Sequence, residues 1–366
     1  MDEKYMELAL ELAQKAAGRT SPNPLVGAVI VKDNKIIGQG YHKKAGTPHA
    51  ERIALLEAGE KAQDADLYVT LEPCNHFGRT PPCTEAIIAA KLKNVYVAVL
   101  DPNPLVAGQG IMRLRNMGLN VVTGIKEQEA RRLNEVFFKY IITKLPYVVL
   151  KSASSLDGKI ATREGHSQWI TGEKARNFGH KLRNMYDAIM VGSGTVLVDD
   201  PQLTCRLENG KDPIRIIVDS KLSISPEAKV LNLKSTAPTI IATTKDAPRE
   251  KYQRLVSKAE ILEVNSGDRV DLKQLIKILG DREITSILVE GGATLSGSLI
   301  EEKLIDKFYL FYAPLIIRGS SAPGFAGGLG PARLEDALKL KDVAIRKIGE
   351  DILVTAYPYY SETVEE

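Results

Sequence analysis

Four residues in one stretch of the sequence have the chemistry of a zinc site and its proton carrier. His49 and Glu51 lie in "TPHAERIALLEAG", and Cys74 and Cys83 lie in "TLEPCNHFGRTPPCTEA". One imidazole and two thiolates make three ligands, which leaves the fourth tetrahedral position of zinc open for water, as in catalytic sites. Zinc lowers the pKa of such a water to about 7. Glu51, two residues from the His ligand, is then placed to move a proton from this water to a leaving amine.

Other interpretations of these four residues stay open at this point. His49 alone is more often structural than a ligand, and two cysteines alone are as often buried thiols. A structural zinc would need a fourth ligand, for which His76 is near enough in sequence. The donor set favours zinc, while the spacing by itself leaves iron as an alternative.

Two predicted helix starts would position the four residues. Thr47 is a capping residue and Pro48 suits a first helical position, so we expect a helix over residues 49–59. Pro82 opens a second helix in the same way, from Cys83. A thiol near a helix N-terminus has a lowered pKa, because the N–H groups there favour negative charge. The helix start therefore favours the thiolate, which is the form that a metal binds.

Strands alternate with helices along the chain, which predicts an α/β layer structure. The first half begins with an amphipathic helix, followed by two apolar runs that flank Asp33 and Asn34, the pattern of a hairpin. Further strands are expected in "ADLYVTL", "KNVYVAVLD" and "LNVVTG". Further helices are expected in "IMRLRNMG" and over residues 127–144.

A domain boundary is expected near Leu145. Pro146 interrupts the first pattern, and "YVVLKSA" begins a new series of strands, which predicts domains of residues 1–145 and 146–366. Helices are expected near residues 268–280 and through Leu299. The remaining strands are predicted in "DAIMVG", "PIRIIVDS", "APTIIATT", "ITSILVEGG", "DKFYLFYAPLII" and "DILVTAYPYY".

The composition is that of an ordinary soluble globular protein. The 366 residues are 44% hydrophobic and 26% charged, with a net charge of +3. No dense Lys/Arg run is present and aromatic residues are only 6%, which disfavours nucleic acid as a partner. No apolar run reaches the roughly 18 residues that span a membrane. Three cysteines are too few for a disulfide framework, so the expected compartment is the cytoplasm.

Two glycine-rich segments of the second domain follow apolar strands, in "MVGSGTVLVDDPQLTCR" and "LVEGGATLSGSLI". Glycine lets backbone N–H groups approach a phosphate, and a following helix N-terminus attracts negative charge. Gly192-x-Gly194 lacks the third glycine of G-x-G-x-x-G, so a Rossmann domain is not supported. From the pattern alone, each segment is either a phosphate site or a structural turn.

The order H-x-E, then P-C, then a second Cys is typical of zinc deaminases, although the spacing here is Cys-x8-Cys instead of C-x-x-C. With the flanks "SPNPLVGAVIV" and "DPNPLVAGQGI", the first half closely resembles the pyrimidine deaminase of riboflavin biosynthesis. The second half resembles the reductase of the same pathway in "LKSASSLDGKIA", "SQWITG" and the two glycine-rich segments. Over nearly its full length, the chain therefore resembles the bifunctional deaminase–reductase family.

The resemblance implies a cytidine-deaminase-like three-layer domain followed by a dihydrofolate-reductase-like domain. It implies zinc (Zn²⁺)-dependent hydrolytic deamination of 2,5-diamino-6-ribosylamino-4(3H)-pyrimidinone 5′-phosphate. It then implies reduction by NADPH of the ribosyl group of 5-amino-6-(5-phosphoribosylamino)uracil to ribityl, and the choice of NADPH over NADH rests on the resemblance alone. Family members self-associate, so we expect a homodimer or homotetramer.

The family's motif positions carry over onto individual residues of this sequence. In the reductase half, Lys151 would polarise or protonate the opening sugar. The substrate contacts of the deaminase half would be Asn23, His42, His76 and Arg79. The substrate contacts of the reductase half would be Ser167, Arg183, Leu203, Arg206 and Glu290, of which the two arginines suit a ribose phosphate. NADPH would contact Ala153, Trp169, Thr195, Asp199 and a loop formed by Gly292, Ala293, Thr294, Leu295, Ser296, Gly297 and Ser298.

Two other functions stay open beside this one. The first domain could be a nucleic-acid base deaminase with an RNA-binding module behind it, although the chain lacks a basic cluster interleaved with aromatics. The second domain could be a non-catalytic NADPH sensor, in which Glu290 and the arginines would serve binding alone. Cys205, in "LTCR", has no evident role.

Overall fold

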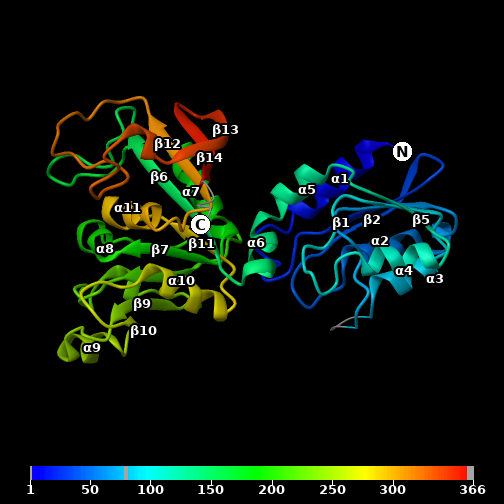
Figure 1. The fold of residues 1–366 in the computed structure, drawn as a ribbon, viewed down its shortest axis with the longest axis horizontal. Helices are drawn as coiled ribbons and strands as arrows, with labels where there is room; N and C mark the ends of the chain where they lie inside the picture. The colour runs from blue at the N-terminus through cyan, green and yellow to red at the C-terminus, as the bar shows by residue number, and fades with distance from the viewer. Residues whose placement is uncertain (1, 78–80, 361–366) are drawn as a thin grey trace. The chain divides into compact units, whose positions relative to one another are not determined.

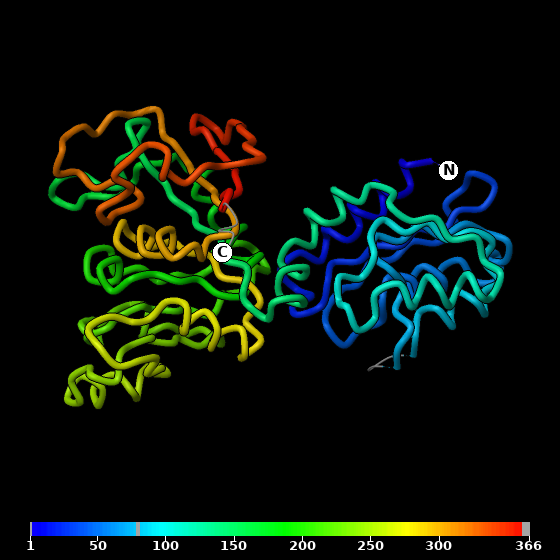
Figure 2. The backbone as a smooth tube through the Cα atoms, viewed as in Figure 1, coloured from blue at the N-terminus to red at the C-terminus, as the bar shows by residue number. Residues whose placement is uncertain are grey.

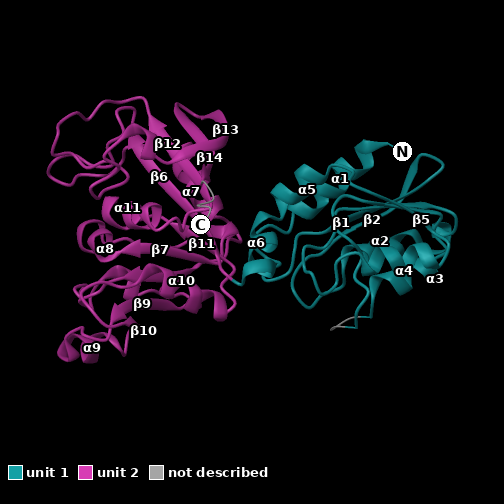
Figure 3. Cartoon of the chain, in the orientation of Figure 1, with its two compact units in different colours: residues 1–144 teal, residues 145–366 magenta. Residues whose placement is uncertain are grey.

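The computed structural model describes residues 2–77 and 81–360 of the chain. The chain divides into two compact units, Met1–Lys144 and Leu145–Glu366 (Figure 3). Each unit is built around a β-sheet of its own (Figure 1). Among the described residues, none of the helices combines the length and the apolar character that a membrane span requires.

Unit 1 contains a five-stranded sheet in the order β2-β1-β3-β4-β5. β1 is antiparallel to both of its neighbours, whereas β3, β4 and β5 run parallel. The strands are β1 (Gly27–Lys32), β2 (Lys35–Tyr41), β3 (Asp66–Val69), β4 (Asn94–Val97) and β5 (Asn120–Thr123). The helices are α1 (Glu3–Gln14), α2 (Ala50–Ala58), η1 (Gly59–Ala62), α3 (Cys83–Ala89), α4 (Gln109–Asn116), α5 (Glu127–Leu133) and α6 (Glu135–Thr143).

Different helices cover the two faces of this sheet, which gives the three layers that the resemblance implied (Figure 1). Ala28 and Ile30 of β1 pack into one core with α2, α3 and α4. Val29 and Val31 pack into the other core with α1 and α5. Successive side chains of a strand point to opposite faces, so a strand buried on both sides is apolar throughout, as "GAVIVK" nearly is.

The hairpin predicted between the first two strands is confirmed. Lys32 pairs with Lys35, and the two residues between them, Asp33 and Asn34, have φ angles of 47° and 59°. A two-residue turn with both positions left-handed matches the twist of the flanking strands, and Asp and Asn tolerate this conformation. The hairpin places β2 at the edge of the sheet, beside α2.

The single long helix predicted over residues 127–144 is wrong, because α5 ends at Leu133 and α6 begins at Glu135. Asn134 between them has φ −111° and ψ 22°, which is not helical. Its buried amide accepts a hydrogen bond from the N–H of Leu25 at 2.8 Å and donates one to the carbonyl of Leu25 at 2.9 Å. A tertiary contact thus outweighs the helical propensity of the local sequence.

Unit 2 contains a nine-stranded sheet in the order β10-β9-β8-β7-β11-β6-β12-β14-β13. The strands from β10 to β12 are parallel, and β14 and β13 complete the sheet in antiparallel fashion. The strands are β6 (Tyr147–Ser155), β7 (Ala188–Gly192), β8 (Ile214–Val218), β9 (Thr239–Thr244), β10 (Glu260–Asn265), β11 (Ser286–Val289), β12 (Lys307–Ala313), β13 (Lys339–Ile348) and β14 (Asp351–Tyr359). The helices are α7 (Glu173–Met185), α8 (Ser193–Asp199), η2 (Lys229–Leu231), α9 (Arg249–Leu255), α10 (Leu272–Asp281), α11 (Ala293–Glu301) and η3 (Leu334–Asp336).

The carboxyl ends of β7, β11, β6 and β12 lie side by side, because these four strands are adjacent and parallel. Open α/β sheets present their ligand groups at this edge. β7 leads directly into α8, and three residues join β11 to α11. Residues 314–338, between β12 and β13, contain only the short helix η3 and form the long orange segment of Figure 2.

Candidate active sites

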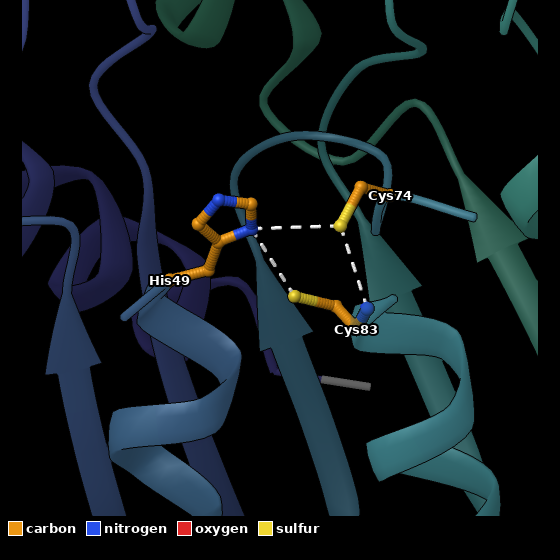
Figure 4. A group of neighbouring side chains, drawn as sticks. All are labelled: His49, Cys74 and Cys83. Carbon is orange, nitrogen blue, oxygen red and sulfur yellow. Dashed lines mark hydrogen bonds between the residues drawn. The ribbon is translucent and has the colours of Figure 1, made fainter. Parts of the chain in front are cut away.

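His49, Cys74 and Cys83 meet in unit 1 although they come from three separate segments (Figure 4). His49 is the residue before α2, Cys74 lies in the turn after β3, and Cys83 is the first residue of α3. The Nδ1 atom of His49 lies 3.5 Å from Sγ of Cys74 and 3.3 Å from Sγ of Cys83. The predicted meeting of these three residues is therefore confirmed.

The first helix start differs from its prediction by one detail. α2 begins at Ala50, so His49 occupies the capping position that was expected for Thr47. The hydroxyl of Thr47 instead donates a hydrogen bond to the carbonyl of Lys44 at 2.7 Å. The second start is as predicted, with Pro82 before a helix that begins at Cys83.

The spacing of the three donor atoms fits tetrahedral zinc. With bonds of about 2.0 Å to nitrogen and about 2.3 Å to sulfur, zinc holds a nitrogen and a sulfur about 3.5 Å apart. The observed separations from the imidazole nitrogen are 3.3 and 3.5 Å. In the part of the chain that the structure describes, this trio has no fourth His, Cys, Asp or Glu ligand, and His76 is exposed outside it. Three ligands are the number that a catalytic zinc site uses.

The two thiols differ in their readiness to ionise. Hydrogen bonds from the thiol of Cys83 and from His49 lower the pKa of Cys74 to about 4. The backbone N–H of Cys83, at the start of α3, also donates to Sγ of Cys74 at 3.4 Å. The bond to the Cys74 thiolate, followed by burial, raises the pKa of Cys83. The helix start and His49 therefore stabilise the thiolate form of Cys74, which is the form that a metal binds.

Glu51 lies beside this trio in the first turn of α2. It is 3% exposed, and its Oε2 atom has no hydrogen-bond partner among the described residues. Burial, and then the charge of Cys74, raises the pKa of this carboxyl. A buried acceptor without a partner indicates that a water or ligand completes the site. A carboxyl with a raised pKa is also suited to exchange a proton near neutral pH.

His42 contacts Asn23 and is 2% exposed. Its Nδ1 lies 3.3 Å from the carbonyl of Pro48, which can only accept, so Nδ1 carries the hydrogen. Nε2 then accepts from the side-chain amide of Asn23 at 3.1 Å. This leaves Oδ1 as the acceptor that Asn23 can offer a ligand. The ring of His42 also packs edge-on against His49, with centroids 5.3 Å apart.

The other predicted substrate contacts of unit 1 are less defined. Arg79 lies outside the described residues, and His76 is exposed. Sequence analysis missed Asp101, a half-buried carboxylate whose pKa is raised by burial and which is close enough to His76 and Cys74 to interact with their charges. In the sequence, Asp101 is the first residue of "DPNPLVAGQGI", a segment that the sequence analysis used only as a flank of the deaminase motif.

In unit 2, Glu290 lies at the sheet edge where β11 ends, and two cations approach it. Arg183 of α7 forms a fork, with Nε 2.8 Å from Oε1 and Nη2 3.0 Å from Oε2. Nζ of Lys151 lies 3.6 Å from Oε2. Burial would raise the pKa of Glu290, but the charges of Arg183 and Lys151 outweigh it and lower the pKa to about 2.

Arg183, predicted as a phosphate clamp, makes three contacts within the protein. Its guanidinium fork is occupied by Glu290, and Nη1 donates to the carbonyl of Thr204 at 3.0 Å. Arg206 is exposed, and its backbone N–H lies 3.4 Å from Nδ1 of His180, a residue that sequence analysis missed. Of the two arginines, Arg206 is the exposed one, while Arg183 is half-buried.

The predicted cofactor loop is in fact a helix start. Gly292 caps α11, so Ala293, Thr294, Leu295, Ser296, Gly297 and Ser298 are helical. Leu295, Ser296 and Gly297 are buried. A Cβ at Gly297 would lie 2.0 Å from the carbonyl oxygen of Gly327, so this position serves close packing. Any cofactor contact of this segment is therefore expected at its first residues.

Further predicted residues surround the two helix starts. A Cβ at Gly292 would lie 3.7 Å from Oγ1 of Thr195, so the starts of α8 and α11 are neighbours. Asp199, in the last turn of α8, accepts a hydrogen bond from the hydroxyl of Ser167 at 2.7 Å. Trp169 is 67% exposed, with the guanidinium of Arg176 4.8 Å from its ring centre.

The last two predicted positions belong to the sheet edge and to the loop after α8. Ala153 lies in β6, where it is half-buried and pairs with Phe311 of β12. Leu203 is 3% exposed and has a φ of 56°. Cys205 follows two residues later, and its thiol donates to the carbonyl of His180 at 3.5 Å.

Comparisons with known proteins cover both units. Residues 1–99 match the cytidine and deoxycytidylate deaminase zinc-binding region, and residues 146–354 match the RibD C-terminal domain. The chain is 48% identical to riboflavin biosynthesis protein RibD of Aquifex aeolicus, over 97% of this chain and 98% of that protein. It is 43% identical to RibD of Escherichia coli, over 96% of this chain and 98% of that protein.

Solved structures agree over the same length. RibD of Acinetobacter baumannii, at 40% identity, superposes with a TM-score of 0.86 over 98% of this chain and 99% of that chain. The diaminohydroxyphosphoribosylaminopyrimidine deaminase/5-amino-6-(5-phosphoribosylamino)uracil reductase of Thermotoga maritima also superposes with a TM-score of 0.86, at 40% identity and 98% coverage of both chains. The cytidine-deaminase-like and dihydrofolate-reductase-like folds are thereby confirmed. The chain belongs to the RibD family of riboflavin biosynthesis enzymes, which join a zinc-dependent deaminase to an NADPH-dependent reductase.

Proposed function

We propose that unit 1 deaminates 2,5-diamino-6-ribosylamino-4(3H)-pyrimidinone 5′-phosphate. We propose that unit 2 then reduces the ribosyl group of 5-amino-6-(5-phosphoribosylamino)uracil to ribityl. The observation that carries the first step is the three-donor site of His49, Cys74 and Cys83 beside Glu51, whose Oε2 atom has no hydrogen-bond partner among the described residues. A nucleic-acid base deaminase is set aside because the family match extends through the reductase unit.

In the deaminase, the chain's residues bind the ring and carry the protons. His49, Cys74 and Cys83 would hold zinc, which when bound supplies an acidic water. Glu51 would carry a proton from the attacking water to the leaving amine, for which its raised pKa suits it. Asn23 offers Oδ1 to the substrate because its amide nitrogen is already engaged by His42. His42 therefore acts through Asn23, while His76 and Arg79 are assigned to the mouth of the site and the phosphate.

In the reductase, Glu290 orders the cations that face the sugar. NADPH supplies the hydride, and the protein supplies orientation and charge. Ala153, Trp169, Thr195, Asp199 and the start of α11 are assigned to the cofactor. Lys151, ion-paired with Glu290 at 3.6 Å, is the proton donor to the opening ribose ring. Arg206 is assigned to the ribose phosphate, with Ser167 and Leu203 lining the substrate.

The test supplies purified protein with the diaminopyrimidine ribosyl phosphate and follows ammonia and NADPH with time. We expect ammonia without added NADPH, and NADPH oxidation only after ammonia has formed or when deaminated substrate is supplied. Ammonia without NADPH oxidation would make unit 2 a non-catalytic sensor. No ammonia from zinc-loaded protein would mean that the site in unit 1 serves another substrate.

We also propose that the protein is a cytoplasmic homodimer or homotetramer. Its three cysteines are all free thiols, as a reducing compartment favours. Strand β13 ends the nine-stranded sheet with Val343 and Ile345 exposed by 53% and 70%, and such an edge favours association with another chain. Light scattering on the eluting protein tests this, and a monomer at micromolar concentration would contradict it.

A further inference from the structure

Glu72, two residues before the metal ligand Cys74, is a buried carboxylate that the proposed chemistry does not use. Glu72 is 6% exposed. Its Oε1 accepts hydrogen bonds from the backbone N–H groups of Gly110 at 2.9 Å and Ile111 at 3.3 Å. Its Oε2 accepts from those of Asp101 at 3.2 Å and Gly108 at 2.9 Å. One side chain thus binds four N–H groups of residues 101–111, three of them at the start of α4.

The close approach of α4 to the Cys74 turn depends on this carboxylate and on a glycine. The capping residue of α4, Gly108, has no side chain to cap the helix, so Glu72 supplies the cap from another segment. A Cβ at Gly110 would lie 2.1 Å from the carbonyl oxygen of Pro73. The start of α4 therefore lies directly against the residue before Cys74.

The opposite side of the turn is attached to α3. The N–H of Cys83 donates to Sγ of Cys74 at 3.4 Å, and the N–H of Thr84 donates to the carbonyl of Cys74 at 3.2 Å. The N–H of Glu72 donates to the carbonyl of Val99 at 3.0 Å. The turn is thus fixed between the starts of α3 and α4, with Glu72 as its attachment to α4.

The segment that Glu72 binds begins with a carboxylate next to the site. Asp101 is half-buried, its backbone N–H is bound by Glu72, and its own side chain accepts from the N–H of Asn103 at 2.9 Å. Its charge interacts with those of His76 and Cys74. A displacement of residues 101–111 would therefore move Asp101 relative to the thiolate of Cys74.

We propose that Glu72 is a positioning residue of the deaminase. By tying residues 101–111 to the turn of Cys74, it sets both the place of that ligand and the distance of Asp101 from it. It acts through the four backbone N–H groups that its carboxylate binds. The inference rests on the proposed function only for the measurement of deamination, which uses the proposed substrate.

Glu72→Gln is the sharpest substitution, because it keeps the shape and replaces one acceptor by an NH₂ donor. Whichever way the amide turns, two backbone N–H groups then face a donor. Partners that orient metal ligands typically contribute about tenfold to a hundredfold in metal affinity or activity. We expect a loss of this size in zinc retention and in kcat/KM for deamination. NADPH oxidation with deaminated substrate, catalysed by unit 2 of the same chain, is expected to stay unchanged.

The experiment compares the full-length wild type, E72Q and the charge-retaining E72D. A matched control is D219N in unit 2, since Asp219 is 1% exposed and accepts from Ile224 N at 2.9 Å and Ser223 Oγ at 2.8 Å. The readouts are the rate of zinc release to a chelator, kcat and KM for deamination, NADPH oxidation and thermal melting. Zinc release needs no substrate, so it tests Glu72 even if the proposed substrate is wrong.

Faster zinc release and lower kcat/KM in E72Q, with a smaller change in E72D and none in D219N, would support the proposal. Zinc release and kcat/KM within twofold of wild type in a folded E72Q would overturn it. If E72Q does not fold, the same criteria apply to E72D. If unit 1 is lost in both while unit 2 still oxidises NADPH, Glu72 is a folding residue and the positioning role is overturned.

Discussion

Two buried glutamates, one in each unit, lie in opposite surroundings. Glu51 has an oxygen without a partner among the described residues, and burial followed by the charge of Cys74 raises its pKa. Glu290 is nearly as enclosed, with 12% of its side chain exposed, but Arg183 and Lys151 overcome the effect of burial and lower its pKa to about 2. Burial therefore raises the pKa of a carboxyl unless neighbouring cations reverse its effect, as Arg183 and Lys151 do at Glu290.

This difference in pKa assigns different roles to the two carboxyl groups. A carboxyl whose two forms are close in free energy can take up and release a proton, which is what a hydrolytic deamination needs at Glu51. A permanently ionised carboxylate cannot do so, and at Glu290 it serves to hold Arg183 and Lys151 in place. The following predictions test the separation, from the largest effect to the smallest.

Metal removal is expected to act on one unit only. Chelation should abolish ammonia release, because His49, Cys74 and Cys83 of unit 1 would lose their metal. Among the described residues, these three form the one cluster of metal-ligand side chains. NADPH oxidation with deaminated substrate should continue at the original rate. Zinc added back should restore ammonia release, with metal content measured by elemental analysis. Loss of both activities on chelation would show that the two sites are not separate.

Glu51→Gln is expected to lower the rate of deamination by about 10²–10⁴-fold, the contribution of a positioned proton carrier. The amide keeps the shape of the side chain but cannot exchange the proton. Glu60→Gln, at an exposed position in η1, is the control and should have no effect. The measurement is ammonia release in single turnover. A rate within threefold of wild type would remove Glu51 from the mechanism.

Glu290→Gln is expected to lower the free energy of unfolding of unit 2 by about 3–5 kcal/mol, because it leaves two largely enclosed cations without their carboxylate. It should also abolish NADPH oxidation, since Arg183 and Lys151 lose their common anchor. Glu301→Gln, exposed at the end of α11, is the matched control. Denaturant unfolding of the full chain measures the change. An unchanged midpoint would show that the ion pairs contribute nothing.

Lowering the pH should remove the contribution of the same ion pairs to the stability of the wild type. The folded pKa of Glu290, about 2, is below the ordinary 4.5, so its stabilisation is present above pH 4.5 and is lost as pH falls toward 2. A shift of this size corresponds to about 3 kcal/mol. The measurement is the free energy of unfolding between pH 6 and pH 3, in wild type and E290Q. Equal slopes in the two proteins would contradict the assignment.

The zinc trio was predictable because its signals are local. Each ligand stands at a helix start or a turn that its own neighbours specify, such as Pro82 before Cys83. The hairpin at Asp33 and Asn34 was predictable for the same reason. The break at Asn134 was not, because Leu25, its partner, lies 109 residues away. Local patterns thus predict element starts, whereas distant hydrogen bonds decide where a helix stops.

Less of the structure of unit 2 could be predicted from the sequence. α7 was missed because its buried face holds only Ala175, Gly179 and Leu182, too weak an apolar stripe to stand out. β13 was missed because it is almost wholly exposed and its pairing shifts between Lys341 and Ala344. The fork between Arg183 and Glu290 joins residues 107 apart. No spacing in the sequence indicates such a pair.

The division of roles between the two glutamates is tested most directly by assaying E51Q and E290Q in both half-reactions. The account predicts that E51Q loses ammonia release and still oxidises NADPH when given deaminated substrate. It predicts the reverse for E290Q, with ammonia released at the wild-type rate and no NADPH oxidised. Loss of both half-reactions in either folded variant, or retention of ammonia release in E51Q, would contradict it.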